Sequence, residues 1–345
     1  MSRQITYAQA ISEATVLAMK KDPNVLVMGL GVDDVKGIFG TTLEARKKFG
    51  LNRVIGTPAS ENAMTGVAIG AALNGKRPIF VHARNDFMFL ALDQIINNAA
   101  KWKYVYGNDS VVPIVVRGII GKGWGQGPTH SQSIQSVMTH FPGIYVAMPS
   151  TPYIAKGILM KSLESKVPVI IFEHRRLYDF KQYVPEKRYT VDFGKAKIFK
   201  RGKDVTVVAT SILVHQALKA AKIVSDFGIS VEVVDPVTIS PLDEKTIIAS
   251  VKKTGRLICA DTSWLRCGVA SEISAVVAEK AFSFLKAPIK RIALPECPCP
   301  VSRQLEEFFY KDYQDIVCAC FEIVGKKRPN NLFKEKEEDL FLGPY

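Results

Sequence analysis

The amino-acid sequence predicts an α/β protein: a central parallel sheet flanked by helices, followed by a second, smaller α/β domain. Short apolar runs bounded by turn residues alternate with segments of helical periodicity along most of the chain. This alternation breaks once, at a polar and basic stretch that contains Pro185, Gly194 and Gly202. A chain of 345 residues, 47% of them hydrophobic, is long enough to bury two cores of ordinary size.

The first series supplies the strands and helices of the larger domain. Strands are expected at Val25–Met28, Arg77–Val81, Val112–Arg117, Ile144–Ala147 and Val169–Phe172. Helices are expected at Thr6–Lys21, Ala63–Asn74, Leu90–Trp102 and Pro152–Ser165. Within the second helix, Gly66 and Gly70 replace larger side chains, which predicts close packing against a neighbouring backbone or a cofactor.

The second series begins at Val205 and has the same alternating pattern. Strands are expected at Val205–Thr210, Ser230–Asp235, Arg256–Asp261 and Ile289–Ala293, and helices at Leu213–Phe227, Asp243–Thr254 and Val269–Phe284. The predicted division is therefore a domain over 1–185, a linker over 186–203, a domain over 204–324 and a polar tail over 325–345. Phe333, Leu340 and Phe341 are the apolar residues with which the tail could anchor or bind a partner.

Charge and hydropathy limit the function classes. The formal charge is +13, but the basic residues are scattered between apolar elements and no nucleic-acid recognition motif accompanies them. Solvated surface is the preferred interpretation, with an acidic partner subunit as the alternative. No segment reaches the roughly 18 apolar residues that span a bilayer, and the N-terminus lacks an export signal. We expect a soluble protein of the cytoplasm or an organellar matrix.

All six cysteines fall in the last quarter of the chain, which argues against a disulfide framework. Two pairs have C-x-C spacing, whereas structural zinc sites usually place two to four residues between paired ligands. Cys318-Ala-Cys320 also lies in a run that looks like an apolar strand. We predict no metal site and interpret the cysteines as small hydrophobic residues.

Glu61 ends the segment Gly56-Thr-Pro-Ala-Ser-Glu61, between a strand end and the small-residue helix. Parallel α/β folds commonly expose functional groups at such points. From the residues alone, Glu61 is equally explained as a helix-start residue favoured by the helix dipole, with Ser60 as N-cap.

A glycine-rich loop ends at His130, in the sequence GKGWGQGPTHSQ over residues 121–132. Such a loop can approach a ligand closely, and histidine can transfer protons near neutral pH. The alternative is a surface turn whose histidine caps the next helix. His82 and Arg84 follow a strand end, where they either meet an anionic ligand or are simply exposed. Phe87, further on, would ordinarily be a core residue.

Five segments occur in a recognisable order: TPASE, LDQIINNAAK, GQGPTHSQS, PSTPYIAKGILMKSL and PVIIFEH. Together they resemble the beta subunits of the thiamin-dependent first component of 2-oxo acid dehydrogenase complexes, a branch of the transketolase superfamily. The resemblance extends over roughly residues 3 to 324. It implies a thiamin diphosphate pyrimidine-binding domain followed by a transketolase C-terminal-like domain.

The resemblance also implies roles for individual residues. Glu61 matches the glutamate that hydrogen-bonds the cofactor's pyrimidine ring and favours the tautomer that removes the thiazolium proton. Phe87 matches the aromatic residue that stacks on the pyrimidine, and Gly66 is expected near the cofactor. His130 matches the active-site histidine, which assists proton transfer or steadies an oxyanion. Gln132 follows it as a candidate substrate contact.

The Gly-Asp-Gly motif with which this superfamily binds Mg²⁺ and the cofactor's diphosphate is missing from the sequence. The resemblance therefore implies an alpha subunit that carries the Mg²⁺, an α2β2 assembly, and transfer of the acyl group to a lipoyl acyltransferase. Glu-Phe-Met-x-Phe in the family is replaced by Val-His-Ala-Arg-Asn here, so His82 and Arg84 become candidate substrate contacts. The expected reaction is oxidative decarboxylation of a 2-oxo acid; the alternatives are a split transketolase-like subunit acting on sugars and a non-catalytic scaffold.

Overall fold

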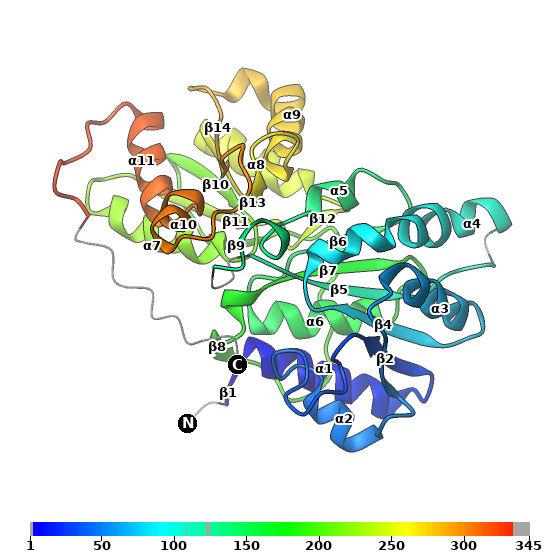
Figure 1. The fold of residues 1–345 in the computed structure, drawn as a ribbon. Helices are drawn as coiled ribbons and strands as arrows, with labels where there is room; N and C mark the ends of the chain where they lie inside the picture. Colours follow the sequence, from blue (N-terminus) through cyan, green and yellow to red (C-terminus); the bar gives the residue numbers. More distant parts are fainter. Residues whose placement is uncertain (1–2, 108, 122–124, 334–345) are drawn as a thin grey trace. The chain divides into compact units, whose positions relative to one another are not determined.

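The computed structural model describes residues 3–107, 109–121 and 125–333, which form two units (Figure 1). The first unit is built from the chain up to Gly121, from His130–Phe193 and from Thr238–Pro241. The rest of the described chain forms the second unit. In this part of the chain no helix is long and apolar enough to cross a membrane.

A seven-stranded sheet is the centre of the first unit. Its strands are parallel except at one edge, where β12 runs antiparallel to β6. The order across the sheet is β12 (Thr238–Ser240), β6 (Tyr145–Ala147), β7 (Val169–His174), β5 (Val115–Ile120), β4 (Arg77–His82), β2 (Val25–Gly29) and β3 (Val54–Gly56). Strands β4, β5 and β7 are almost wholly buried, as parallel strands covered on both faces must be.

Two groups of helices flank this sheet (Figure 1). In one group, α1 packs against α2 and α6; in the other, α3 packs against η1 and η2, which leads into α4. The helical segments of the unit are α1 (Tyr7–Lys21), α2 (Leu43–Phe49), α3 (Glu61–Leu73), η1 (Asn85–Ala91), η2 (Asp93–Ala99), α4 (Ala100–Tyr106), α5 (Gln135–Thr139), α6 (Pro152–Ser162) and η4 (Arg175–Leu177). A small antiparallel pair, β1 (Gln4–Thr6) and β8 (Lys181–Tyr183), completes it.

Local sequence explains where the two long helices on one face begin. At α1, the Thr6 hydroxyl accepts a hydrogen bond from the Gln9 backbone N–H at 3.1 Å, and the Gln9 side chain accepts from the Thr6 N–H at 2.8 Å. This reciprocal arrangement satisfies two amides that a helix start leaves without partners. At α6, Thr151 caps the helix and Pro152 occupies its first position, where no backbone N–H is needed.

Two of the predicted elements differ from the structure in this unit. The expected helix Leu90–Trp102 is a succession of a 3₁₀ segment, η1, a π-helical segment, η2, and the short helix α4. Hydrophobic spacing indicates helical backbone but does not distinguish these hydrogen-bonding patterns. Strand β5 begins at Val115 rather than Val112, since Pro113 has no N–H to donate to a sheet.

The second unit is a five-stranded sheet covered by helices on both faces. Across the sheet the strands are β14 (Lys290–Leu294), β13 (Leu257–Trp264), β10 (Val205–Ala209), β11 (Val231–Asp235) and β9 (Lys197–Lys200). Only β9 is antiparallel to its neighbour. The helical segments are η3 (Gly127–Thr129), α7 (Leu213–Ser225), α8 (Glu244–Thr254), α9 (Val269–Ala281), η5 (Phe282–Phe284), α10 (Arg303–Phe309) and α11 (Tyr313–Val324).

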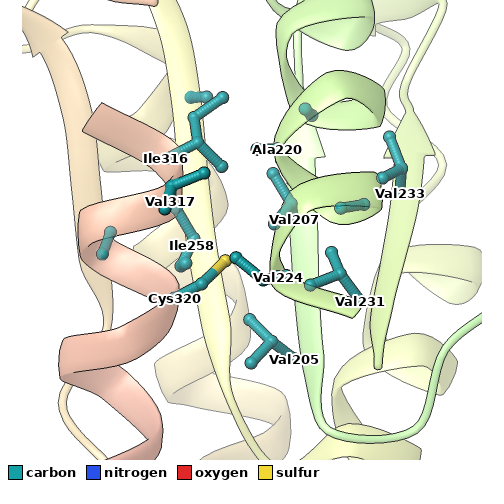
Figure 2. Packing of buried hydrophobic residues seen from close by; sticks show 14 of the residues in the cluster. Val205, Val207, Ala220, Val224, Val231, Val233, Ile258, Ile316, Val317 and Cys320 are labelled. Carbon is teal, nitrogen blue, oxygen red and sulfur yellow. The ribbon is translucent and has the colours of Figure 1, made fainter. Parts of the chain in front are cut away.

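Alternation along β10 separates the two faces of this sheet. Figure 2 shows Val205 and Val207 in an apolar cluster with residues of α7 and α11. Thr206, between them, points to the other face, where its hydroxyl lies 2.7 Å from that of Ser250 and 2.8 Å from that of Thr254, both on α8. Helices therefore pack against both faces of β10, the apolar face and the polar one.

The apolar run around Cys318-Ala-Cys320 is helix α11, so its interpretation as a strand is wrong. Asp312 forms a capping box with Asp315, which starts the helix. Ile316 and Cys320 are four residues apart and both enter the apolar cluster (Figure 2). The buried residues of this segment repeat with helical spacing. The apolar residues between them hide that spacing in the sequence. Phe333, a predicted tail anchor, packs against the same cluster, while Leu340 and Phe341 lie outside the described residues.

Candidate active site

The carboxyl ends of three neighbouring strands gather polar residues in the first unit. Strand β4 pairs with β5 so that His82 lies beside Gly118, and β5 pairs with β7 so that Ile120 lies beside His174. Parallel α/β sheets place ligands at this edge. Arg84 and Phe87 follow β4, and His130 and Gln132 follow β5, whereas Glu61 and Gly66 follow β3, the last strand of the sheet. Lys122, Gly123 and Trp124 of the glycine-rich loop lie outside the described residues.

Glu61 is the first residue of α3 and is partly buried. Within the described chain no group donates a hydrogen bond to its carboxylate, and Ser60 occupies the N-cap position without a side-chain hydrogen bond to the helix. Ser60 thus stands at the expected N-cap position, but its hydroxyl does not cap the helix. The backbone N–H groups of this helix start favour an acidic residue, and its carboxylate retains its capacity to accept hydrogen bonds from another molecule.

Phe87 and His130 come together, although they are far apart in the sequence. Their ring centroids are 5.3 Å apart with an angle of 81° between the planes, an edge-on contact. The Phe87 side chain is 37% exposed, so the expectation of an ordinary core residue is wrong and its ring remains accessible. Phe87 lies on η1, which packs against the helix that Glu61 begins. The structure thus brings the aromatic ring and the histidine into contact, on a segment that packs against the helix begun by Glu61.

The two glycines of α3 have different environments. A Cβ on Gly66 would lie 3.3 Å from Oε1 of Gln94, so this glycine does mark a close approach, to a side chain of η2. A Cβ on Gly70 would meet nothing within 4 Å. Close packing of Gly70 against another part of the described chain is therefore wrong, and its packing against a cofactor stays a prediction.

His82 and Arg84 are buried, which rules out the alternative that they are merely exposed. Burial lowers the pKa of His82 to about 3, so its imidazole is neutral at physiological pH. Its Nε2 atom has no hydrogen-bond partner among the described residues. Both side chains are therefore shielded from bulk water at the strand edge.

His174 was not selected from the sequence, although it ends the strand PVIIFEH. Its imidazole lies against the first glycine of the loop, because a Cβ on Gly121 would be 2.2 Å from Nε2. Burial, reinforced by the cations of Arg176 and Arg84, lowers the pKa of His174 to about 3. Its Nδ1 accepts a hydrogen bond from the Arg176 N–H at 3.2 Å, which fits a neutral ring.

Asn85 and Asp86 were also missed, and they contact the segment that follows His130. Asn85 donates a hydrogen bond to the carbonyl of Gln132 at 2.8 Å and accepts one from the N–H of Ile134 at 3.1 Å. Asp86 accepts one from the N–H of Gln132 at 3.1 Å. Gln132 is thus held through its backbone.

A buried ion pair lies behind this edge. Arg117 on β5 donates to both carboxylate oxygens of Glu173 on β7, at 2.5 and 2.8 Å, and to the Thr41 hydroxyl at 3.0 Å. Tyr178 donates to the same carboxylate at 2.8 Å. Burial alone would lower the pKa of Arg117, but the carboxylate of Glu173 outweighs it and raises that pKa above its ordinary value. The network ties two strands to the loop after β2.

Comparisons with known proteins assign this arrangement to a family. Residues 3–181 match the pyrimidine-binding domain of transketolase, and residues 194–316 match the transketolase C-terminal domain. The beta subunit of acetoin:2,6-dichlorophenolindophenol oxidoreductase from Bacillus subtilis is 42% identical, over 96% of this chain and all of that protein. The beta subunit of the pyruvate dehydrogenase E1 component from the same organism is 38% identical, over 91% of this chain and 97% of that protein.

The chain belongs to the beta subunits of the thiamin diphosphate-dependent 2-oxo acid dehydrogenases. A third relative, the beta subunit of 2-oxoisovalerate dehydrogenase from Bacillus subtilis, is 38% identical over 92% of this chain and 98% of that protein. A solved structure described as a split-gene transketolase, an inactive β4 tetramer, has a TM-score of 0.77 at 23% identity, covering 94% of this chain and 99% of that chain. That likeness shows the fold alone. The predicted fold class and the family resemblance are both confirmed.

Proposed function

We propose that this chain supplies the pyrimidine-binding half of a thiamin diphosphate site, within an enzyme that oxidatively decarboxylates a 2-oxo acid. The main support is the edge contact between Phe87 and His130, on a segment that packs against the helix begun by Glu61. Three residue types that this cofactor requires are therefore present in one unit. The carboxyl group of the substrate leaves as CO₂, and the acyl group passes to the disulfide of lipoamide, which is reduced as the thioester forms.

The residues present fit the cofactor. When bound, thiamin diphosphate would supply a nucleophilic thiazolium carbon. The carboxylate of Glu61, without a described hydrogen-bond partner, holds a proton at the pyrimidine ring nitrogen. The exposed ring of Phe87 offers a stacking face. Gly66 lies on the helix that Glu61 begins, where it packs closely against Gln94. His130 transfers a proton or stabilises negative charge on the substrate oxygen.

A partner subunit is part of the proposal. The sequence has no Gly-Asp-Gly motif to hold Mg²⁺ and the diphosphate, so an alpha subunit supplies both in an α2β2 assembly. A lipoyl acyltransferase then accepts the acyl group. The domain division at 1–185 and 204–324, with the tail beyond 325, belongs to the same proposal.

Acetoin is a second candidate substrate. Beta subunits of acetoin oxidoreductases from Bacillus subtilis and Cupriavidus necator are 42% and 41% identical to this chain, against 38% for the pyruvate and 2-oxoisovalerate relatives. His82 and Arg84 also make the strand edge more polar than the family pattern of Glu-Phe-Met-x-Phe. A small hydroxyketone that accepts hydrogen bonds suits such an edge.

The test is reconstitution of this chain with a purified alpha subunit. The purified assembly, with thiamin diphosphate and Mg²⁺, is assayed for release of CO₂ or acetaldehyde from pyruvate, branched-chain 2-oxo acids and acetoin, with sugar phosphates as controls. Cofactor-dependent turnover of a 2-oxo acid supports the leading function, and turnover of acetoin alone supports the second. Turnover of sugar phosphates alone contradicts both.

A further inference from the structure

Beyond the residues that contact cofactor or substrate, we propose that Asn85 and Asp86 are positioning residues that together fix His130 against Phe87. We call this pair, with its hydrogen bonds to residues 132 and 134, the Asn85–Asp86 clamp. Its consequence for catalysis rests on the proposed function, whereas its effect on the backbone around His130 does not.

Asn85 uses both ends of its amide. The side chain is fully buried. Its Nδ2 lies 2.8 Å from the carbonyl of Gln132 and 3.2 Å from that of Ile119, and its Oδ1 accepts from the N–H of Ile134 at 3.1 Å. One side chain therefore connects the end of β5 to two residues after the glycine-rich loop. A buried amide that forms hydrogen bonds through both its nitrogen and its oxygen favours one local geometry.

Asp86 completes the clamp from the next position. Its Oδ1 accepts a hydrogen bond from the N–H of Gln132 at 3.1 Å, and its Oδ2 lies 3.2 Å from Nδ2 of Asn85. Gln132 is consequently gripped at both its N–H and its carbonyl, by adjacent side chains. Two directional bonds to the peptide groups on either side of one Cα atom restrict rotation as well as translation.

The clamp also restrains Phe87 and His130, because both are close to it in the sequence. Phe87 directly follows Asp86, and His130 precedes Gln132 by two residues. The clamp thus joins the two backbone segments immediately beside the Phe87–His130 contact. Its hydrogen bonds span 46 to 49 residues of sequence, so they join parts of the chain that local structure does not connect.

The presence of a carboxylate at position 86 is not explained by a contribution to the stability of the fold. Burial raises the pKa of Asp86, against the hydrogen bonds from Gln132 and the charge of Arg84, which lower it. When folding raises the pKa of a carboxyl group, its charged form is less stable in the folded protein than in water. The charge on Asp86 therefore opposes folding. A positioning role gives a reason for its presence that a purely structural role lacks.

The test compares Asp86→Asn with Asp226→Asn, a control on the exposed C-cap of α7. The asparagine amide must face either Nδ2 of Asn85 or the N–H of Gln132, so one contact of the clamp becomes a donor facing a donor. Hydrogen–deuterium exchange of the full chain is then measured over residues 130–136. We expect exchange to accelerate about tenfold in Asp86→Asn, the equivalent of one lost hydrogen bond, and to stay unchanged in the control.

Kinetics of the assembled enzyme provide the second measurement. Misplacement of a catalytic group by about 1 Å can cost roughly 100-fold in rate. Asp86→Asn should therefore lower kcat by about 10- to 100-fold and leave KM within about twofold. Wild-type exchange together with wild-type kcat overturns the clamp. Loss of assembly in both Asp86→Asn and Asp86→Ser also overturns it, because the pair would then determine the fold rather than a position.

Failure of the two proposals can be told apart. If the wild-type assembly turns over neither 2-oxo acids nor acetoin, the proposed function fails, yet faster exchange over 130–136 in Asp86→Asn still supports the clamp. If the wild-type enzyme is active and the variant equals it in exchange and kcat, only the clamp fails.

Discussion

Glu173→Gln tests how much the buried ion pair contributes to the first unit. Glutamine has nearly the same volume as glutamate and can still accept a hydrogen bond from Tyr178, so the substitution removes charge without creating a cavity. It leaves the Arg117 guanidinium, whose side chain is 0% exposed, without a counter-charge. Breaking a buried pair in this way costs about 3–5 kcal/mol.

This loss should appear as a large shift in thermal unfolding. For a unit of this size 1 kcal/mol corresponds to roughly 2–4 °C, so the Tm of the first unit should fall by roughly 6–20 °C. Differential scanning calorimetry is the appropriate assay, because two units need not unfold in one transition. The transition of the second unit provides an internal control.

The double variant Arg117→Met/Glu173→Gln separates charge from packing. With the guanidinium gone, this network contains no unpaired charge, and the double variant should recover most of the stability that Glu173→Gln loses. A single variant that unfolds within about 2 °C of wild type, or a double variant no more stable than the single one, would refute this account of the network.

Three further outcomes are expected. The pKa of His82 is about 3 in the folded protein and about 6.5 when unfolded, so the folded state loses stability as pH falls from about 6.5 to 3, by up to ~1.4 kcal/mol per pH unit. In urea titrations the unfolding free energy of His82→Phe should therefore depend less on pH than that of wild type. An equal dependence on pH in the two proteins would contradict this. Gly121→Ala should lower the Tm, because φ is +91° and the new Cβ would lie 2.2 Å from Nε2 of His174; the control Gly75→Ala, at φ +85° with open space, should cost less. Three cysteines are exposed, Cys267, Cys297 and Cys318, and three are buried, Cys259, Cys299 and Cys320. Under native conditions a thiol reagent should label the exposed cysteines quickly and the buried ones only on unfolding. Rapid reaction of all six would be inconsistent with the structure.

The fold was largely predictable because most of its elements have a recognisable pattern of apolar and turn residues in the local sequence. Apolar runs bounded by turns identify β2, β4, β7 and β10 to within two residues of their ends. Strand β12 was missed because its three residues carry no strand pattern of their own; it exists through pairing with β6, about 90 residues earlier in the chain. Such long-range pairing leaves little local trace.

The candidate site was predictable only in part, for a related reason. Glu61, Phe87 and His130 stand in motifs that a family resemblance identifies. Asn85 and Asp86 reach backbone groups 46 to 49 residues away, and side-chain-to-backbone bonds impose no residue type on the partner. The environment of His82 was equally hidden, because a polar residue after a strand is as compatible with exposure as with burial.

Glu61→Gln in the assembled enzyme tests the central claim most directly. Glu44→Gln is the matched control, an exposed acid in the first turn of α2. We predict that Glu61→Gln assembles and binds thiamin diphosphate but loses about 10²- to 10⁴-fold in kcat, whereas Glu44→Gln keeps wild-type turnover. If Glu61 serves only the helix dipole, both variants will instead lose about 0.3–1 kcal/mol of stability and remain fully active. Wild-type turnover by Glu61→Gln would contradict the account.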